Sequence, residues 1–331
     1  QRLNDVNLRA VMEEGGWQAR LASREATGEL TWRDQGRGRL QARFRQLAIS
    51  GGTSGTDTAA RSADRLSELP GLDVTADSFV LRGRALGKLD LKAANRGDTW
   101  RLEHLSLASP DGTLSGDGSW RPGAKEETRL NFKLDVGSIE KMLARLGYPE
   151  AVRQGKAQLD GEIGWRGPPT ALHLASLNGH MNVRGEGGQF SQLEPGVGRL
   201  LGVLSLQALP RRITLDFRDV FSQGFAFDRI SGSIQMNDGV LRTEDLELVG
   251  PAARVFMSGD ADAVRETQSL RVKVQPTLSE SVAVGSALAT TGVIHPAVGL
   301  AAYLVQKALR DPVEKLFSFE YAVTGSWSDP K

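Results

Sequence analysis

The stretch Arg129-Leu-Asn-Phe-Lys-Leu-Asp-Val136 alternates apolar and polar residues without a break. Its even-numbered residues fall on one face of an extended strand, and its odd-numbered residues fall on the other. A strand with one apolar and one polar face is typical of an antiparallel sheet that is covered on one side only. We therefore predict a half-buried antiparallel strand here.

The same alternation recurs along the chain, at Trp17–Leu21, Ile213–Phe217 and Leu270–Val274. Turn signals such as Asp111-Gly112 and Asn237-Asp238-Gly239 separate the runs. The pattern predicts roughly 16 to 19 strands and contains no alternation of strands with helices of the kind that builds parallel sheets. The fold class is therefore mainly β.

A weak internal repeat accompanies the alternation. The run Gly87-Lys-Leu-Asp-Leu91 begins a three-strand meander, and Gly232-Ser-Ile-Gln-Met236 begins a similar one. Repetition of such a unit favours an elongated array over a compact fold. We expect a repeat-built antiparallel sheet whose segments are 1–155 and 156–331, joined as one continuous structural unit.

The composition excludes several classes of function. The chain has 331 residues and a formal net charge of +1, with 41 basic and 40 acidic residues interspersed, so it has no electrostatic footprint for nucleic acid. Cysteine is absent, which excludes disulfides, thiolate metal sites and a cysteine nucleophile. The four histidines are scattered without metal-ligand spacing, and no motif for nucleotide binding or nucleophilic catalysis is present. We expect no enzyme activity, no catalytic residue, no metal and no cofactor.

Helices are few. Ser138 is placed to cap a helix over Ile139–Leu146 that stops at Gly147, and Pro195 can open another that runs to Leu209. The stretch Ser281–Gln306 contains no charged residue, but Pro296 interrupts it and an alternating strand pattern follows it. We predict two short apolar helices here rather than a membrane span. They either close the end of a core or touch a lipid surface.

The apolar faces of the strands have to be buried, and two architectures can do this. Two sheets can stack as a sandwich, which is the usual outcome of alternation. Alternatively, one long sheet can bend into a trough whose apolar face holds acyl chains. Aromatic residues make up only 6% of the chain, so its interior is aliphatic, and this together with the repeat favours the trough.

Several segments resemble the C-terminal region of AsmA-like envelope proteins, specifically the YhdP branch. They are Gly198-Arg-Leu-Leu-Gly-Val-Leu-Ser-Leu-Gln-Ala-Leu-Pro-Arg-Arg212, Leu215-Asp-Phe-Arg-Asp-Val-Phe221, Gly224-Phe-Ala-Phe-Asp228, Gly250-Pro-Ala-Ala-Arg254 and Tyr321-Ala-Val-Thr-Gly-Ser-Trp-Ser-Asp-Pro330. The resemblance is specific from about Pro195 onward. Upstream of Pro195 it rests only on the sequence pattern of the three-strand meander.

This resemblance implies a long periplasmic protein that spans between the two membranes of a Gram-negative envelope. It also implies an N-terminal inner-membrane anchor, which this sequence lacks, and a taco-shaped β-groove that conducts phospholipid. The expected function is that of a lipid-transfer conduit, with phospholipid and the inner leaflet of the outer membrane as partners. The alternative is a periplasmic scaffold or assembly factor that binds outer-membrane or periplasmic proteins through its sheet edges.

Strand parity predicts which side chains face the lipid. The expected groove floor comprises Leu215, Phe217, Ile234, Met236, Leu246, Leu248, Val255, Met257, Leu270, Val272, Val274, Phe319 and Tyr321. The residues expected to contact the membrane, within and just after the uncharged stretch, are Val298, Leu300, Leu304, Lys307 and Arg310.

Overall fold

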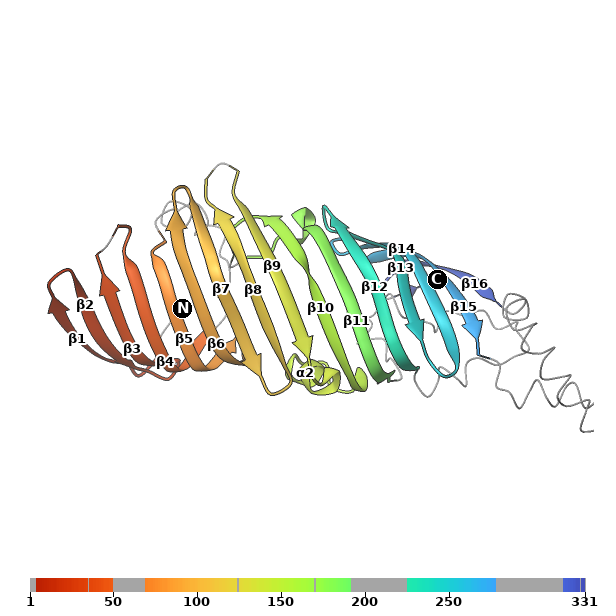
Figure 1. Cartoon of the computed structure of the whole chain (residues 1–331), viewed down its shortest axis with the longest axis horizontal. Helices are drawn as coiled ribbons and strands as arrows, with labels where there is room; N and C mark the ends of the chain where they lie inside the picture. Colours follow the sequence, from red (N-terminus) through yellow and green to blue (C-terminus); the bar gives the residue numbers. More distant parts are fainter. Residues whose placement is uncertain are drawn as a thin grey trace, which may run out of the picture.

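The computed structural model describes residues 4–34, 36–49, 69–123, 125–169, 171–191, 225–277, 318–327 and 329–330. Within these residues the chain forms one open sheet of 17 strands (Figure 1). The strands are β1 (Asn7–Glu13), β2 (Gly16–Ala22), β3 (Ala26–Arg33), β4 (Arg39–Ile49), β5 (Gly71–Leu81), β6 (Arg84–Arg96), β7 (Thr99–Ser109), β8 (Gly112–Arg121), β9 (Glu127–Val136), β10 (Val152–Arg166), β11 (Asn178–Phe190), β12 (Ala226–Asn237), β13 (Val240–Val249), β14 (Ala253–Asp262), β15 (Thr267–Pro276), β16 (Phe319–Ser326) and β17 (Asp329–Pro330).

The strands are arranged in chain order, so each strand pairs with the strand that follows it in the sequence. Tight turns make this possible. Asp111-Gly112 begins β8 and Asp238-Gly239 joins β12 to β13, and both turns were predicted from the sequence. Asp238 and Gly239 both have positive φ, which a two-residue hairpin turn of this kind requires.

One pair departs from the predicted antiparallel arrangement, because β4 and β5 are parallel. A parallel pair cannot be joined by a tight turn and needs a crossover of about a dozen residues or more. The connection between Ile49 and Gly71 is long enough for this. Alternation of apolar and polar residues predicts a strand but not its direction, so the parallel pair could not be predicted from it.

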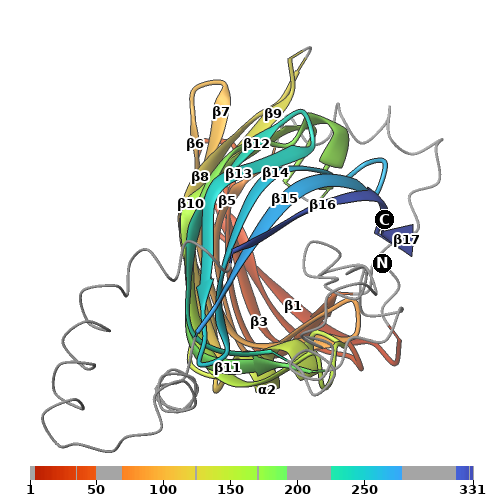
Figure 2. The same ribbon diagram turned by 90° about the vertical axis from the view of Figure 1, so that its right-hand side faces the viewer.

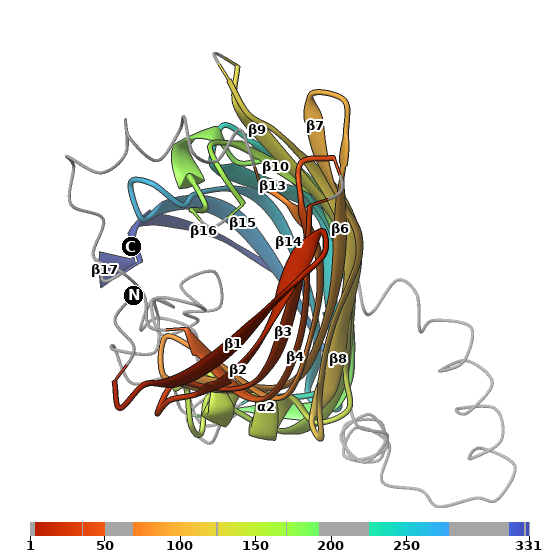
Figure 3. The same cartoon turned by 90° about the vertical axis from the view of Figure 1, so that its left-hand side faces the viewer.

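The sheet is bent across its strands into a trough (Figures 2 and 3). Each strand arcs around the trough, and the long axis of the molecule runs from β1 to β16, across the strands. The trough was the favoured alternative in the sequence analysis. Among the described residues no second sheet stacks on the first, since all the described strands belong to one sheet.

Helix α2 (Ile139–Arg145) forms as predicted. The side chain of Ser138 accepts a hydrogen bond from the backbone N–H of Lys141, and Leu146 is the C-cap. Ile139 and Leu143 pack against apolar residues of the sheet, so the helix lies at the end of β10 for a packing reason. The other described helix is a single turn, η1 (Leu174–Ser176).

Strand β10 spans the position at which the two sequence segments were divided, and it pairs with both β9 and β11. That division stays a prediction. The helices expected over Pro195–Leu209 and Ser281–Gln306 lie outside the described residues. No helix within the described part of the chain is both long enough and apolar enough to span a membrane.

Candidate functional site

The register of the sheet aligns one apolar position from every strand between β1 and β16. Each residue of this set is the direct cross-strand partner of the next, except at one bulge between β12 and β13. We call the set the axial row: Leu8, Leu21, Gly28, Phe44, Ala76, Leu89, Leu107, Leu114, Leu134, Leu159, Val183, Gly232, Leu246, Met257, Val272 and Tyr321.

The axial row is a continuous apolar line along the trough. Neighbouring strands lie about 4.8 Å apart, so a row that crosses sixteen strands is about 70 Å long. A second row runs beside it on the same face, one pleat away. Its members are Ala10, Ala19, Leu30, Ala42, Val74, Leu91, Leu105, Gly116, Phe132, Gly161, Met181 and Ile234.

One glycine keeps the axial row continuous where the ladder is irregular. The register between β12 and β13 shifts between Ser231 and Gln235. Gly232 lies at this bulge, and a Cβ on it would be 2.7 Å from the Cα of Leu246. A larger residue would therefore force the two strands apart and break the row.

The opposite face of the sheet is polar and carries cross-strand ion pairs. Examples are Arg20 with Glu29 at 3.0 Å and Arg242 with Asp260 at 2.7 Å. Glu247 is bridged by Arg229 and Arg254 from the two flanking strands. The two faces thus differ in chemistry along the whole trough.

The apolar face is the concave one. Val272 is 1% exposed and Val255 and Met257 are 2% exposed, although only one sheet is described. Side chains converge on the inside of a curved sheet and spread apart on the outside. The strong burial of these residues agrees with convergence on the inside, so we assign the apolar face to the inside of the trough.

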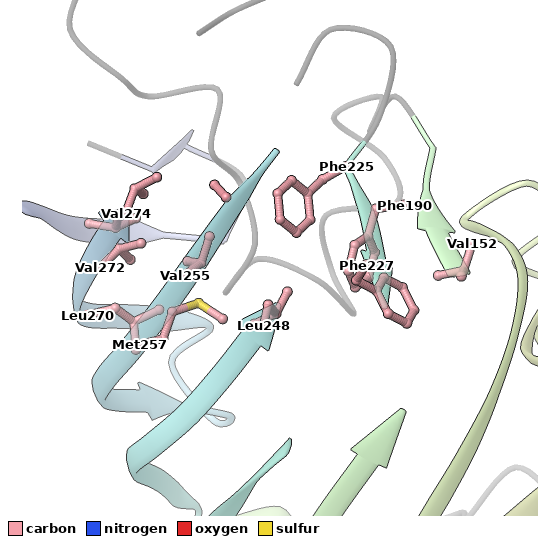
Figure 4. Packing of buried hydrophobic residues seen from close by; sticks show 12 residues of the cluster. Val152, Phe190, Phe225, Phe227, Leu248, Val255, Met257, Leu270, Val272 and Val274 are labelled. Atoms are coloured by element: carbon pink, nitrogen blue, oxygen red, sulfur yellow. The ribbon is translucent and has the colours of Figure 1, made fainter. Parts of the chain in front are cut away.

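The most buried part of this face lies over β12 to β16. Figure 4 shows side chains of this cluster, among them Leu248, Val255, Met257, Leu270, Val272 and Val274, gathered over these strands. Phe190 and Phe227 extend the cluster toward β11, with ring centroids 5.0 Å apart. Val152 and helix α2 complete it on the β10 side.

The structure brings most of the predicted floor residues together. Leu246, Met257, Val272 and Tyr321 belong to the axial row. Leu248, Val255, Val274 and Phe319 form the adjacent row, and Leu270 pairs with Val323 on the other side of the axial row. Ile234 ends the second row, and Met236 is buried one pleat farther on.

Other predicted site residues lie outside the described residues. These are Leu215 and Phe217 of the expected floor and the expected membrane contacts Val298, Leu300, Leu304, Lys307 and Arg310. Whether any floor residue binds lipid stays a prediction.

Sequence reasoning missed the N-terminal two-thirds of the face. Leu89, Leu107, Leu114, Leu134 and Leu159 continue the axial row upstream but were not assigned to the floor. Their strands alternate apolar and polar residues in the same way, so strand parity could have identified these leucines as floor residues. Floor residues were instead predicted only in the region where the family resemblance was specific.

The pKa values of two ionisable groups reflect the different environments on the two faces of the sheet. Burial raises the pKa of Tyr321, a member of the axial row, so its surroundings disfavour a charge. On the polar face, Arg43 donates to Asp73 at 2.8 Å and holds the pKa of that carboxyl below its ordinary value. This ion pair joins the parallel strands β4 and β5.

Within the described residues no group of three or more metal-ligating side chains lies together. His173 Nδ1 is 2.8 Å from the hydroxyl of Ser176, which also accepts from the backbone N–H of Arg166. These contacts fix the single turn η1 beside β10. His104 and His180 lie on separate strands, and His295 is outside the described residues.

A trough with this inner face can cover apolar chains along its whole length while its outer face stays in water. The family model described as "YhdP protein" matches residues 1–331, which extends the similarity over the whole chain. The chain is also 31% identical over 252 residues to "Intermembrane phospholipid transporter YhdP" of Escherichia coli (strain K12). That alignment covers 75% of this chain and 20% of the relative, so the chain spans about a fifth of the relative's length. No solved structure matches.

Proposed function

Because the chain belongs to the YhdP family, we propose that it forms one section of a conduit that shields phospholipid acyl chains from water between the inner and outer membranes of a Gram-negative envelope. The observation that carries the proposal is the axial row, which continues without an interrupting charge from β1 to β16. The relative is named as a phospholipid transporter, and this chain corresponds to a fifth of it, so the proposal concerns a section of a longer path.

The energetics explain why such a row is useful. Each methylene that leaves water contributes about 0.8 kcal/mol, so a 16-carbon acyl chain that crosses water unaccompanied meets a barrier on the order of 10 kcal/mol. An apolar surface at every strand removes most of that barrier. Because the contacts repeat about every 4.8 Å, no single position holds the chain much more tightly than the next.

The proposed conduit is passive, and no chemical step is assigned to it. The relative's description as a transporter supports this view. Acyl chains lie on the concave apolar face, and the polar headgroup stays in water at the open side of the trough. We propose that segments 1–155 and 156–331 serve as one continuous path, which is supported by strand β10, since it spans the division and pairs with both β9 and β11.

We also propose that the chain works in the periplasm and meets the inner leaflet of the outer membrane. The residues proposed for this contact are Val298, Leu300, Leu304, Lys307 and Arg310. Flotation of the purified chain with phospholipid vesicles tests the contact. The double variant Val298→Asp, Leu304→Asp should float less than the wild type and melt at the same temperature. Wild-type protein that never floats would remove the membrane from the proposal.

A second candidate function is that of an assembly factor that pairs with other envelope proteins. Strand β1 supports it, because Leu8, Val11 and Met12 are more than half exposed and β1 pairs only with β2 among the described strands. Such an edge can accept a strand from a partner. The amount of lipid bound to the purified chain distinguishes the two candidate functions, since a protein-binding scaffold has no need of bound lipid.

The test of the main proposal is mass spectrometry of the chain purified from a Gram-negative host without detergent. The conduit should carry phospholipid, and a charge at a buried axial-row position should reduce the amount. A matched variant on the outer face, Lys273→Glu, should carry as much lipid as the wild type, whereas Val272→Lys should carry less. Lipid-free wild-type protein, or equal lipid in both variants, refutes the proposal.

A further inference from the structure

The apolar inner face contains one buried glutamine with no hydrogen-bond partner. Gln268 of β15 is 5% exposed, and neither its side-chain nitrogen nor its side-chain oxygen has a partner. It has the strand parity of Leu270, Val272 and Val274, so it belongs to the same face as the floor. A buried amide without partners destabilises a fold, because it has given up its hydrogen bonds to water.

The surroundings of Gln268 are apolar. Its cross-strand partners are Ala261 on β14, 6% exposed, and Gly325 on β16. The next pair on this face is Leu270 with Val323, and both are buried. Gly325 has no side chain, so nothing from β16 covers Gln268 at the directly opposed position.

A second unpartnered donor lies next to this position. The indole N–H of Trp327 is buried and has no acceptor. The backbone N–H of Trp327 donates to the carbonyl of Glu266 at 2.8 Å, which places Trp327 beside the residue two before Gln268. The two orphaned groups therefore lie at the same end of β15, where the strand meets the rim of the trough.

The chemistry of this pair points to a neutral ligand rich in acceptors. Gln268 and Trp327 together offer N–H donors, and Gln268 adds one acceptor. The inner-face residues of β13 to β16 include no lysine or arginine in the described ranges. A phosphate in this position would lack a cation, whereas the carbonyl oxygens of carboxylic esters are neutral acceptors and need none.

We propose that Gln268 and Trp327 form a site for the glycerol ester linkage of a diacyl phospholipid. The linkage is the part of the lipid at which apolar chains meet polar atoms, and Gln268 is the point at which the apolar face reaches the rim. Val272 lies four residues farther along β15, about 13 Å away, so the acyl chains extend from the linkage onto the axial row. The headgroup then lies beyond the rim, near the exposed side chain of Arg265.

This inference rests on the proposed function and adds a defined polar contact to an otherwise apolar path. Without lipid, the site holds an unpaired amide and an unpaired indole N–H. With lipid, the ester carbonyls accept from both. The section near β15 is therefore a position at which lipid pauses, and it distinguishes ester-linked lipid from other apolar chains.

The test compares two phosphatidylethanolamines with the same tails, one ester-linked and one ether-linked, because the ether lipid lacks both carbonyls. A photo-crosslinking residue at Leu241 reports on this site, since Leu241, Ala261 and Gln268 form one cross-strand row. A crosslinking residue at Leu134, far along the axial row, reports on the path elsewhere. The wild type should favour the ester lipid about thirtyfold at Leu241, as expected for two added hydrogen bonds, and show no preference at Leu134.

The variants Gln268→Leu and Trp327→Phe should each lower the preference at Leu241 to about fivefold, since each removes one of the two hydrogen bonds. The matched control is Gln275→Leu, on the outer face of the same strand, which should keep it. In lipid-free protein, Gln268→Leu should melt no lower than the wild type, since an unpaired amide is replaced by an apolar group of similar size.

Three results would overturn the site. They are equal crosslinking of the two lipids at Leu241, a preference that Gln268→Leu leaves undiminished, and a lipid-free Gln268→Leu protein that melts well below the wild type, as it would if the amide were paired within the protein. If any of these results is obtained and lipid still crosslinks at Leu134, the site is refuted but the proposed conduit is not. Absence of crosslinking at both positions rejects the conduit and the site together.

Discussion

A carboxylate in the middle of the axial row should obstruct the path of an acyl chain. Leu159 of β10 is half-buried, and its cross-strand partners are Leu134 and Val183. The substitution Leu159→Asp leaves the carboxylate in water when the trough is empty, because no second layer covers this position among the described residues. An acyl chain that passes over it has to remove that water.

The cost of passage follows from this desolvation. Taking a carboxylate out of water costs several kcal/mol even after the surroundings relax. A penalty of about 3 kcal/mol corresponds to roughly a hundredfold slower passage. The second row, with Phe132, Gly161 and Met181 at this level, offers a partial detour. We therefore expect transfer to slow by at least about tenfold.

The assay is transfer of a fluorescent phospholipid between donor and acceptor vesicles by the purified chain. The matched control is Gln158→Asp, which adds the same charge on the outer face, opposite Arg184. The control should transfer lipid at the wild-type rate, and both variants should retain the wild-type circular dichroism spectrum. Equal transfer by Leu159→Asp and wild type would falsify the assignment of the axial row as the lipid path.

Three further predictions concern stability. Ser138→Ala removes the cap of α2, whose hydroxyl accepts from the Lys141 N–H at 3.3 Å, and should cost about 1 kcal/mol in denaturant unfolding; an unchanged midpoint would mean that the cap contributes nothing. Asp73 has a pKa lowered by Arg43, so its contribution is present above the ordinary carboxyl pKa near 4 and is lost as pH falls through the lower folded value. Asp73→Asn should therefore cost about 1–2 kcal/mol at neutral pH and little near pH 2, and an equal cost at both pH values would contradict the ion pair. Tyr321 has a raised pKa, so its contribution is present below the ordinary phenol pKa near 10 and declines as pH rises above it; Tyr321→Phe should lessen the loss of stability in alkali, and an identical alkaline profile would place the phenol in water.

Much of the fold could be predicted from local patterns. The alternation of Arg129–Val136 gave a strand, and β9 spans Glu127–Val136. Ser138 and Gly147 bounded a helix that the structure places at Ile139–Arg145. These features depend on residues close in sequence, so the sequence alone determines them.

Register could not be predicted, because it depends on pairings between distant residues. On β7, Leu102 and Leu105 have opposite parity, yet both pack with the apolar face. A bulge between them restores the alignment. A one-residue slip moves every side chain of a strand to the other face, so parity alone cannot extend a row across such a bulge.

The polar site at the rim was also missed, although the sequence contains a signal for it. Gln268 has the parity of Leu270, Val272 and Val274 and interrupts an otherwise apolar series. A single polar residue at the edge of a strand is usually solvated, so its burial without a partner became evident only from the three-dimensional packing.

The most direct test of the central claim is a photo-crosslinking scan along β15 with bound phospholipid. Crosslinking residues placed one at a time from Leu270 to Val274 sample both faces of one strand. Lipid adducts should alternate along the strand, with high yield at Leu270, Val272 and Val274 and low yield at Arg271 and Lys273. Equal yields on the two faces, or higher yields at Arg271 and Lys273, would contradict the assignment of the concave apolar face as the lipid path.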